Sequence, residues 1–423
     1  MLSDSIADCK PKLSGTAMNR LIGPRPEARI ARVEVHEFGY TVDGLGVDAS
    51  GNRCVMKGAQ SRLTAFALKI ETQDGHQGEY CSVHSGKNGA MVGQVKAAAG
   101  LILGEDAEER EAIYNKLKRA HRHYMAIGHS ALDIALWDLA GKAVGRPVWR
   151  LLGGYRQRLP TYASTLNGGR DGILDSIEAY ADFAEECLAL GYRGYKIHGW
   201  GEGDPKEEAA NLLLCARRVG GRMELMYDAA SELRTLADAI YVGKACDEGG
   251  YLWYEDPFMD AGWSPHAARQ LKENIRTPLM LTEHVRGLES KAAWLRERAT
   301  DYLRVDPDYD MGITGTMKVA HLAEAFGLDC EIHAAGPAQR HCMAAMRNSS
   351  WYELSLVAPG VANPVPPVFG SGYSDALEDI GEDGCVPVPD GPGLGVEYDW
   401  DYILANRTAY QEFTLKKDGG TAK

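Results

Sequence analysis

Residues 224–256 read ELMYDAASELRTLADAIYVGKACDEGGYLWYED, a stretch in which two short apolar segments flank a longer segment with helical composition. Each apolar segment ends in an acidic residue, Asp228 in the first and Glu255 in the second. The segment between them is long enough for the helical crossover that parallel strands require. The stretch therefore predicts a strand–helix–strand unit with a carboxylate at the end of each strand.

The same alternation repeats over residues 159–358. Eight such units over about 200 residues match the length of a parallel (β/α)₈ barrel of the TIM type. A Rossmann sheet is less favoured, because no Gly-x-Gly-x-x-Gly motif follows any of the strands. The expected strands are 161–164, 194–198, 224–228, 251–255, 279–283, 302–306, 330–333 and 352–356.

The residues before the barrel predict an α+β capping domain. Apolar and charged residues alternate over 28–40 and 64–72, as in half-buried strands, and a Gly-rich stretch at 44–58 separates them as a loop. Residues 105–144 have the composition of a helix. The expected divisions are an irregular lead-in at 1–27, the α+β capping domain at 28–158, the barrel at 159–358 and a C-terminal segment at 359–423 that returns to the capping domain.

Composition narrows the class of protein. The 423 residues are 45% hydrophobic and 25% charged, values typical of a globular protein with a sizeable core. The net charge of −13 argues against a nucleic-acid partner. No apolar stretch approaches the roughly 20 residues of a membrane span, and no secretory signal is recognisable. The nine cysteines form no CxxC pair, so reduced thiols and a cytoplasmic location are expected.

Polar residues gather at the ends of the predicted barrel strands. In a barrel these carboxyl ends converge on one face, where active sites are built. Side chains alternate along a strand, so the first two of these residues project to the same side. The residues are Lys196 and His198 after the second strand, Asp228, Glu255 and Glu283 after the next three, and Asp306 and His333 after the sixth and seventh.

The three carboxylates predict a metal site. Asp228, Glu255 and Glu283 are spaced by about one strand–helix unit each, which places them on neighbouring strand ends. Three adjacent carboxylates would repel one another if they were left unpaired, and a hard divalent cation removes that conflict. Oxygen ligands with room for water and for a substrate carboxylate suit Mg²⁺ better than Zn²⁺, and Mn²⁺ is a possible substitute.

These residues, together with the Trp-Asp-Leu-x-Gly-Lys motif at 137–142 in the predicted helix 131–148, resemble the mandelate racemase subgroup of the enolase superfamily. The resemblance covers most of residues 28–400. It implies one Mg²⁺ per subunit on the three acids, an Asp306–His333 dyad, and Glu353 as a protonated acid that hydrogen-bonds the substrate carboxylate. Such enzymes take small carboxylate substrates, and an assembly of two or eight copies is expected.

The chain departs from the founding pattern of the subgroup at His198, where a second lysine is usual. Lys-x-His variants are associated with dehydration of sugar acids and with lactone cycloisomerisation. The leading hypothesis is therefore removal of the proton α to a carboxylate, followed by loss of water, which converts an aldonate or aldarate into a 2-keto-3-deoxy acid. Lys196, pushed towards its neutral form, and His198 are the predicted base, and His333 is the predicted acid. These two roles could exchange.

Two other functions remain open at this point. The same residues could racemise, epimerise or cycloisomerise a substrate without loss of water. A non-catalytic relative that kept the fold is less favoured, because every ligand and dyad position carries a competent residue. Four further residues are candidates for substrate contact, although loop polarity or packing explains them equally well. They are His84 and Lys87 in a loop of the capping domain, Trp200 after the second barrel strand, and His284 beside Glu283.

Overall fold

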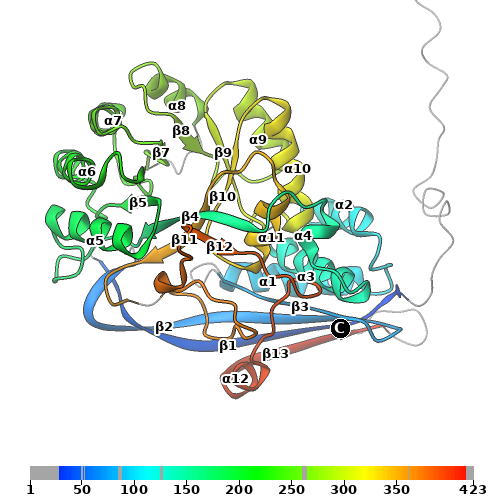
Figure 1. Ribbon diagram of the computed structural model, residues 1–423. Helices are drawn as coiled ribbons and strands as arrows, with labels where there is room; N and C mark the ends of the chain where they lie inside the picture. The colour runs from blue at the N-terminus through cyan, green and yellow to red at the C-terminus, as the bar shows by residue number, and fades with distance from the viewer. Residues whose placement is uncertain are drawn as a thin grey trace, which may run out of the picture.

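The computed structural model describes residues 28–48, 51, 53–83, 88–123, 127–259, 264–361 and 363–415 (Figure 1). The predicted lead-in at 1–27 lies outside these residues, as do His84 and Lys87. Among the described residues, no helix is long and apolar enough to cross a membrane. The eight cysteines in this part of the chain are all free thiols.

The capping domain is built on an antiparallel sheet with the strand order β13-β1-β2-β3. Strand β1 (Ile30–Val47) and strand β2 (Arg53–Thr72) form a long hairpin, and β3 (Gln77–Cys81) pairs with β2. The prediction of a loop over 44–58 is wrong, because β1 and β2 continue through most of it. Leu45 and Val55 are buried there, so the glycines interrupt a strand pair without ending it.

Four helices follow the hairpin: α1 (Asn88–Ile102), α2 (Arg110–Ala120), α3 (Gly128–Ala143) and the short α4 (Val148–Leu151). The continuous helix expected over 105–144 is therefore two helices, and α1 was not predicted. Helix α3 packs closely on β3, because a Cβ atom at Gly78 would lie 2.0 Å from the carbonyl oxygen of Ala135. The small residues at this contact thus serve close packing.

The barrel is present with its eight parallel strands in the predicted places. The neighbour order β10-β9-β8-β7-β6-β5-β4-β11 follows the chain, which confirms the TIM-type fold. The strands are β4 (Arg158–Thr165), β5 (Gly194–His198), β6 (Glu224–Asp228), β7 (Trp253–Glu255), β8 (Leu279–Leu281), β9 (Tyr302–Val305), β10 (Cys330–Ile332) and β11 (Tyr352–Val357).

Helices on the outside of the barrel connect these strands (Figure 1). Local signals fix several of their ends: the Ser176 and Thr235 hydroxyls accept backbone N–H groups at the starts of α5 and α7, and Gly191 and Gly250 end the same helices with φ of 107° and 70°. The helices are α5 (Ile177–Leu190), α6 (Pro205–Val219), α7 (Leu236–Gly249), α8 (Pro265–Lys272), α9 (Leu288–Arg296), α10 (Gly312–Ala325) and α11 (Pro337–Ala345).

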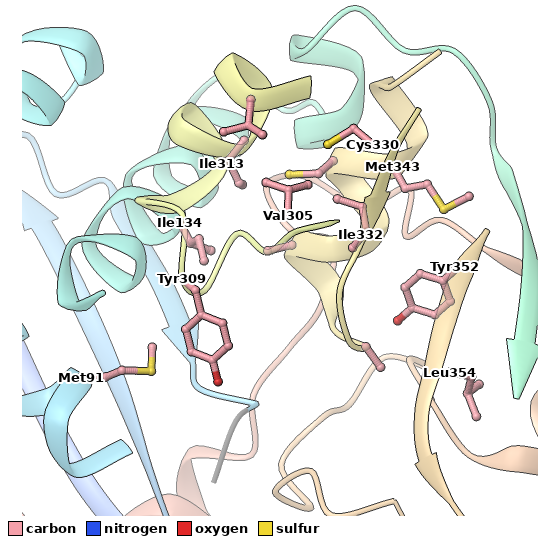
Figure 2. Close-up of a cluster of buried hydrophobic side chains, with 14 of the residues drawn as sticks. Met91, Ile134, Val305, Tyr309, Ile313, Cys330, Ile332, Met343, Tyr352 and Leu354 are labelled. Atoms are coloured by element: carbon pink, nitrogen blue, oxygen red, sulfur yellow. The ribbon is translucent and has the colours of Figure 1, made fainter. Parts of the chain in front are cut away.

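One hydrophobic core joins the barrel to the capping domain. Met91 of α1 and Ile134 of α3 belong to the same buried cluster as Val305, Ile313 and Ile332 of the barrel (Figure 2). Shared burial of this kind fixes two domains firmly, because separating them would expose apolar surface to water. The cap is therefore held at a defined place beside the barrel.

After the last barrel strand the chain returns to its first sheet. A 3₁₀ turn (η3, Leu377–Asp379) precedes β12 (Cys385–Pro387), which pairs with β4. Helix α12 (Trp400–Ala405) leads to β13 (Arg407–Thr414), which runs antiparallel to β1. The final strand thus closes the outer edge of the capping sheet.

Candidate active site

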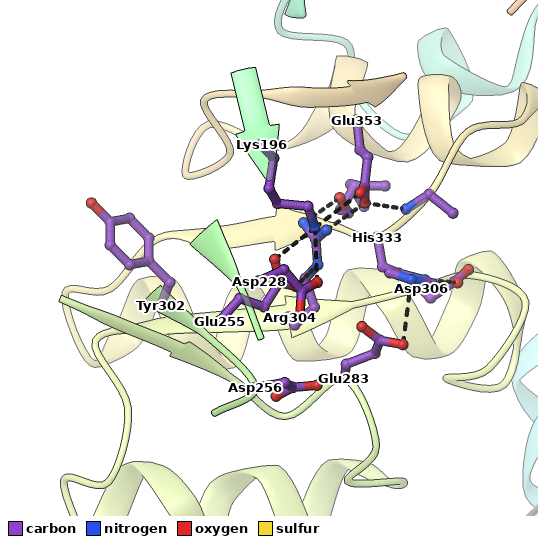
Figure 3. Close-up of polar contacts among 12 residues, drawn as sticks. Lys196, Asp228, Glu255, Asp256, Glu283, Tyr302, Arg304, Asp306, His333 and Glu353 are labelled. Carbon is purple, nitrogen blue, oxygen red and sulfur yellow. Dashed lines mark hydrogen bonds and ion pairs between the residues drawn. The ribbon is translucent and has the colours of Figure 1, made fainter. Parts of the chain in front are cut away.

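The carboxyl ends of the central barrel strands bring the predicted acids together (Figure 3). Asp228 is the last residue of β6, Glu255 is the last residue of β7, and the strand register pairs them directly. Glu283 follows β8 by two residues. One carboxylate oxygen from each acid lies within 4.8 Å of the others.

This donor set fits a divalent cation. Asp228 and Glu255 are buried, and the three side chains offer only oxygen atoms, the ligands that hard cations prefer. Burial raises the pKa of Glu255 to about 7, while Arg304 and Lys196 act in the opposite direction. Glu283 also forms a second group with Asp256 and His284. Within the described residues neither buried oxygen of Asp256 accepts a hydrogen bond, and His284 Nε2 lies 3.3 Å from Oδ2.

Lys196 lies beneath the acids and contacts three carboxylates. Its Nζ is 2.7 Å from Glu255 Oε2, 2.9 Å from Glu353 Oε1 and 3.2 Å from Asp228 Oδ2. Burial lowers the pKa of Lys196, but Glu255 and Glu353 raise it more, so it lies well above its usual range. The anions around Lys196 thus favour its charged form, whereas the predicted shift towards a neutral amine depends on a bound cation beside it and stays a prediction.

His198 projects from the end of β5 and lines the cavity. Its Nε2 atom is 2.9 Å from Asp228 Oδ2, and its backbone N–H donates to the Thr165 hydroxyl at 2.8 Å. Burial lowers the pKa of His198, but the neighbouring Asp228 raises it more, and the net shift is upward. His198 is therefore coupled directly to one of the acids of the candidate metal site.

Trp200 does not line the cavity, contrary to the predicted substrate contact. Its side chain is buried, and its indole N–H donates to the carbonyl of Leu174 at 2.9 Å. Its backbone N–H donates to Glu208 Oε1, also at 2.9 Å. Trp200 packs edge-to-face against Tyr180, whose hydroxyl donates to the carbonyl of His198 at 2.6 Å. The residue supports the turn after β5 from behind.

His333 and Asp306 form the predicted pair on the opposite side of the acids. His333 Nδ1 is 2.6 Å from Asp306 Oδ2, and His333 Nε2 is 3.4 Å from Glu283 Oε1. Asp306 is fixed in turn, since its Oδ1 accepts from the backbone N–H of Asp308 at 2.8 Å and from Gln339 at 3.2 Å. A histidine oriented in this way can hold or move a proton at a defined place.

Glu353 is surrounded by cationic donors that favour its ionised form, and its predicted role as a protonated acid on the substrate carboxylate stays a prediction. Burial raises the pKa of Glu353, but Arg304 and Lys196 lower it further, to well below its usual range. Its Oε2 accepts from Arg304 and, at 2.8 Å, from the backbone N–H of Ala334. The carboxylate is thus already satisfied by strong donors on both oxygens.

Arg304 is the main site residue that sequence reasoning missed. It is fully buried at the centre of the barrel, where its Nε lies 2.8 Å from Glu255 Oε1. It also donates to the Ile332 carbonyl at 2.8 Å and to the Tyr162 hydroxyl at 3.0 Å. Its position two residues before Asp306 puts both side chains on one face of β9, which is the signal that could have found it.

A cavity of about 320 Å³ opens between these strand ends and the cap. The capping hairpin contributes Leu45 and Arg53 to its wall. His284, a predicted candidate for substrate contact, lines this cavity. The barrel contributes His198, Asp228, Asp256, Glu283, His284, His333 and Glu353.

Comparison with known proteins places the chain in a family. Residues 55–153 match the mandelate racemase / muconate lactonizing enzyme N-terminal domain, and residues 179–402 match the enolase C-terminal domain-like family. Together these matches cover most of β2, all of β3, helices α1 to α4, and the barrel from β5 to β11. The chain belongs to the mandelate racemase-like enzymes of the enolase superfamily.

Individual relatives include dehydratases and cycloisomerases. The chain is 26% identical to arabinonate dehydratase of Saccharolobus solfataricus, over 83% of this chain and 92% of the relative. It is 30% identical to D-galactarolactone cycloisomerase of Agrobacterium fabrum, over 84% and 92%. Among solved structures it resembles D-glucarate dehydratase from Agrobacterium tumefaciens complexed with magnesium, with 30% identity, a TM-score of 0.79, and coverage of 90% and 100%.

Proposed function

We propose that this protein is a Mg²⁺-dependent hydro-lyase that dehydrates a sugar acid, an aldonate or an aldarate, to a 2-keto-3-deoxy acid. One observation carries the proposal: a trio of acids suited to a hard cation, of which Asp228 and Glu283 line the cavity, lies between His198 on one side and the His333–Asp306 pair on the other. The dehydratases among the relatives support the same reaction class.

The metal would be held by Asp228, Glu255 and Glu283. When bound, Mg²⁺ stabilises the second negative charge that develops on the substrate carboxylate as the neighbouring C–H bond breaks. Mg²⁺ in particular is inferred from the all-oxygen donor set and from the magnesium complex of the related D-glucarate dehydratase.

The proton transfers are carried out by residues on the two sides of the acidic trio, His198 on one side and His333 on the other. His198, which lines the cavity, takes the proton from carbon-2 of the substrate, while Lys196 stays protonated beneath it and orients Asp228 and Glu255. His333 gives a proton to the hydroxyl on carbon-3, so the C–O bond breaks and water leaves. The resulting enol then gains a proton at carbon-3 and becomes the 2-keto acid. The histidines exchange roles for the opposite configuration at carbon-2.

A turnover screen tests the proposal. The protein is incubated with a library of aldonates and aldarates and MgCl₂, and 2-keto acids are detected as semicarbazones. We expect at least one acid sugar to give a 2-keto-3-deoxy product, and we expect chelation by EDTA to abolish that turnover. A screen in which no acid loses water, despite measurable Mg²⁺ binding, would contradict dehydration.

A second candidate function is cycloisomerisation or epimerisation at the same site. It is favoured by the 30% identity to D-galactarolactone cycloisomerase. The products separate the two reactions. Incorporation of deuterium from D₂O at carbon-2 without a keto product, or conversion of a lactone to an open-chain acid, would identify an isomerase.

The assembly state stays a prediction. Two or eight copies are expected, and light scattering on the purified protein tests this. The proposed partner is the small acid-sugar substrate, consistent with related proteins such as L-talarate dehydratase from Polaromonas, which was solved with Mg and L-glucarate.

A further inference from the structure

Helix α9 carries a lysine that points away from solvent into the barrel wall. Lys291 is fully buried, although an isolated buried ammonium is strongly unfavourable. Its Nζ lies 2.5 Å from the carbonyl oxygen of Arg304, 3.0 Å from that of Thr282 and 3.1 Å from Asp310 Oδ2. An ammonium has three N–H groups, so each can meet one acceptor. The Lys291 ammonium is therefore held by three hydrogen bonds as well as by the charge of Asp310.

The Thr282 carbonyl, one of these acceptors, lies next to the predicted metal ligand Glu283. Thr282 separates the end of β8 from Glu283 and has a φ of 86°, a left-handed value that is unfavourable for a β-branched residue. This turn directs Glu283 towards Asp228 and Glu255. The Thr282 hydroxyl donates to the Arg304 carbonyl at 3.1 Å, and Lys291 binds both carbonyls at this point. The strained turn is thus tied to β9 from two sides.

Asp310, the third partner of Lys291, connects it to the Asp306–His333 pair. Asp310 Oδ2 accepts from Lys291 and, at 2.9 Å, from the backbone N–H of Asp306. The Asp310 N–H donates in return to the Asp306 carbonyl at 2.8 Å. Asp306 is the residue that binds His333 Nδ1. A continuous chain of contacts therefore runs from Lys291 through Asp310 to the proposed acid.

We propose that Lys291, with Asp310, is a positioning residue that fixes Glu283 and His333 relative to each other, an inference that rests on the proposed function. His333 Nε2 and Glu283 Oε1 are 3.4 Å apart and come from different strands. Lys291 binds the backbone beside Glu283 directly and the Asp306–His333 pair through Asp310, yet it is not among the residues that line the cavity. Partners behind metal ligands typically change metal affinity or activity by about 10–100-fold.

The test uses the full-length Lys291→Met variant, which keeps the length of the side chain and removes its charge and donors. We expect Mg²⁺ affinity, measured by titration calorimetry without substrate, to fall about 10–100-fold. We also expect kcat to fall at least as much, while KM changes by less than about threefold, because Lys291 does not line the cavity. A folded variant with Mg²⁺ affinity and kcat within about twofold of the wild type would overturn the inference.

Lys272→Met is the matched control. Lys272 also binds an aspartate and a carbonyl, with Nζ 2.6 Å from Asp301 Oδ1 and 3.4 Å from the Thr300 carbonyl, but it does so at the opposite end of the barrel. We expect this variant to lower the melting temperature and to leave Mg²⁺ affinity and kcat within about twofold. An equal loss of Mg²⁺ affinity in both variants would mean that Lys291 acts only through stability, which also overturns the inference.

Asp310→Asn keeps the proposal testable if Lys291→Met does not fold. The asparagine oxygen can still accept from the Asp306 N–H, but the ion pair with Lys291 is lost. We expect kcat to fall about 10-fold or more, with a smaller change in Mg²⁺ affinity, because the Thr282 carbonyl keeps its donor. Unchanged kcat in a folded Asp310→Asn variant would overturn the inference. The affinity measurement needs no substrate, so a failure of the proposed dehydration is seen separately, in the wild-type screen.

Discussion

The two flanks of the acidic trio carry the same kind of side chain in different settings. His333 binds Asp306, a carboxylate outside the candidate metal ligands that is itself fixed by Asp308 and Asp310. His198 binds Asp228, which is one of the candidate ligands. One histidine is thus oriented by a dedicated partner, and the other by a residue it would share with the metal. We infer that proton transfer and metal binding are more strongly coupled on the His198 side.

Replacing His333 by Asn should have the largest effect. An Asn amide can keep the contact to Asp306 that Nδ1 makes, but it cannot carry the proton. We expect kcat for dehydration to fall by about 10³–10⁴-fold, within the range for loss of a general acid or base. Mg²⁺ affinity, measured by calorimetry, should stay within about threefold. Full turnover by this variant on the true substrate would remove His333 from the mechanism.

Replacing His198 by Gln should have the next largest effect on kcat. It differs from the His333 substitution because His198 contacts Asp228, a candidate metal ligand. The Gln amide can reach Asp228 in place of Nε2, so the variant removes the proton carrier and keeps a donor. We expect kcat to fall by about 10²–10³-fold. His198→Ala, which also removes the contact to Asp228, should change Mg²⁺ affinity further. If neither His198 variant changes Mg²⁺ affinity more than His333→Asn does, the inferred difference between the flanks is wrong.

A pH-dependent contribution to stability should come from Glu331, away from both flanks. Burial raises the pKa of Glu331 to about 7, although N–H groups of Trp351 and Ser350 and the Ser349 hydroxyl lower it. Since its ordinary value is 4.5, the folded protein binds more protons than the unfolded chain between about pH 4.5 and 7. Stability should therefore fall as pH rises through this window.

The Glu331→Gln variant tests this effect by calorimetric melting at pH 5 and pH 8. The melting temperature of the wild type relative to the variant should decrease by about 2 °C or more on going to pH 8, because only the wild type must ionise a buried carboxyl. Glu224→Gln, at an exposed position, is the control and should show no such trend. Parallel curves for wild type and Glu331→Gln would contradict the assignment.

The smallest effect is expected for Trp200→Phe. The indole is buried behind β5 and does not line the cavity, so kcat and KM for the substrate should stay within about twofold. Loss of the hydrogen bond to Leu174 should lower the free energy of unfolding by about 1 kcal/mol. A large rise in KM would instead restore the predicted contact with substrate.

The strand ends were the part of the site most accessible to sequence reasoning. Asp228, Glu255 and Glu283 recur with the period of the strand–helix unit, and parallel topology alone brings such residues to one face. The spacing of Arg304 from Asp306 could have indicated a shared strand face, but the contacts that Arg304 makes could not be predicted from it. The roles of Arg304 and Lys291 depend on contacts between different strands and helices, which a local pattern does not record.

The electrostatic surroundings of Lys196 and Glu353 were also beyond sequence reasoning. The sequence does not show that these two side chains lie within 3 Å of each other, or that Arg304 binds Glu353 as well. Such mutual stabilisation of charge depends on three strands meeting at the centre of the barrel. The capping hairpin shows the same limit, since glycines at 44–58 suggested a loop and only the pairing of β1 with β2 accounts for the strand.

The hydroxyl of Tyr80, on β3 of the cap, donates to Asp308 inside the barrel. Asp308 in turn donates its backbone N–H to Asp306, the partner of His333. The cap is therefore connected to the Asp306–His333 pair by hydrogen bonds that do not involve the substrate. Consider a chimaera in which this cap is exchanged for that of a relative in order to alter substrate preference. Such a chimaera would need an equivalent phenol at position 80. Without it, His333 would be misplaced, whichever acid the chimaera had been designed to accept.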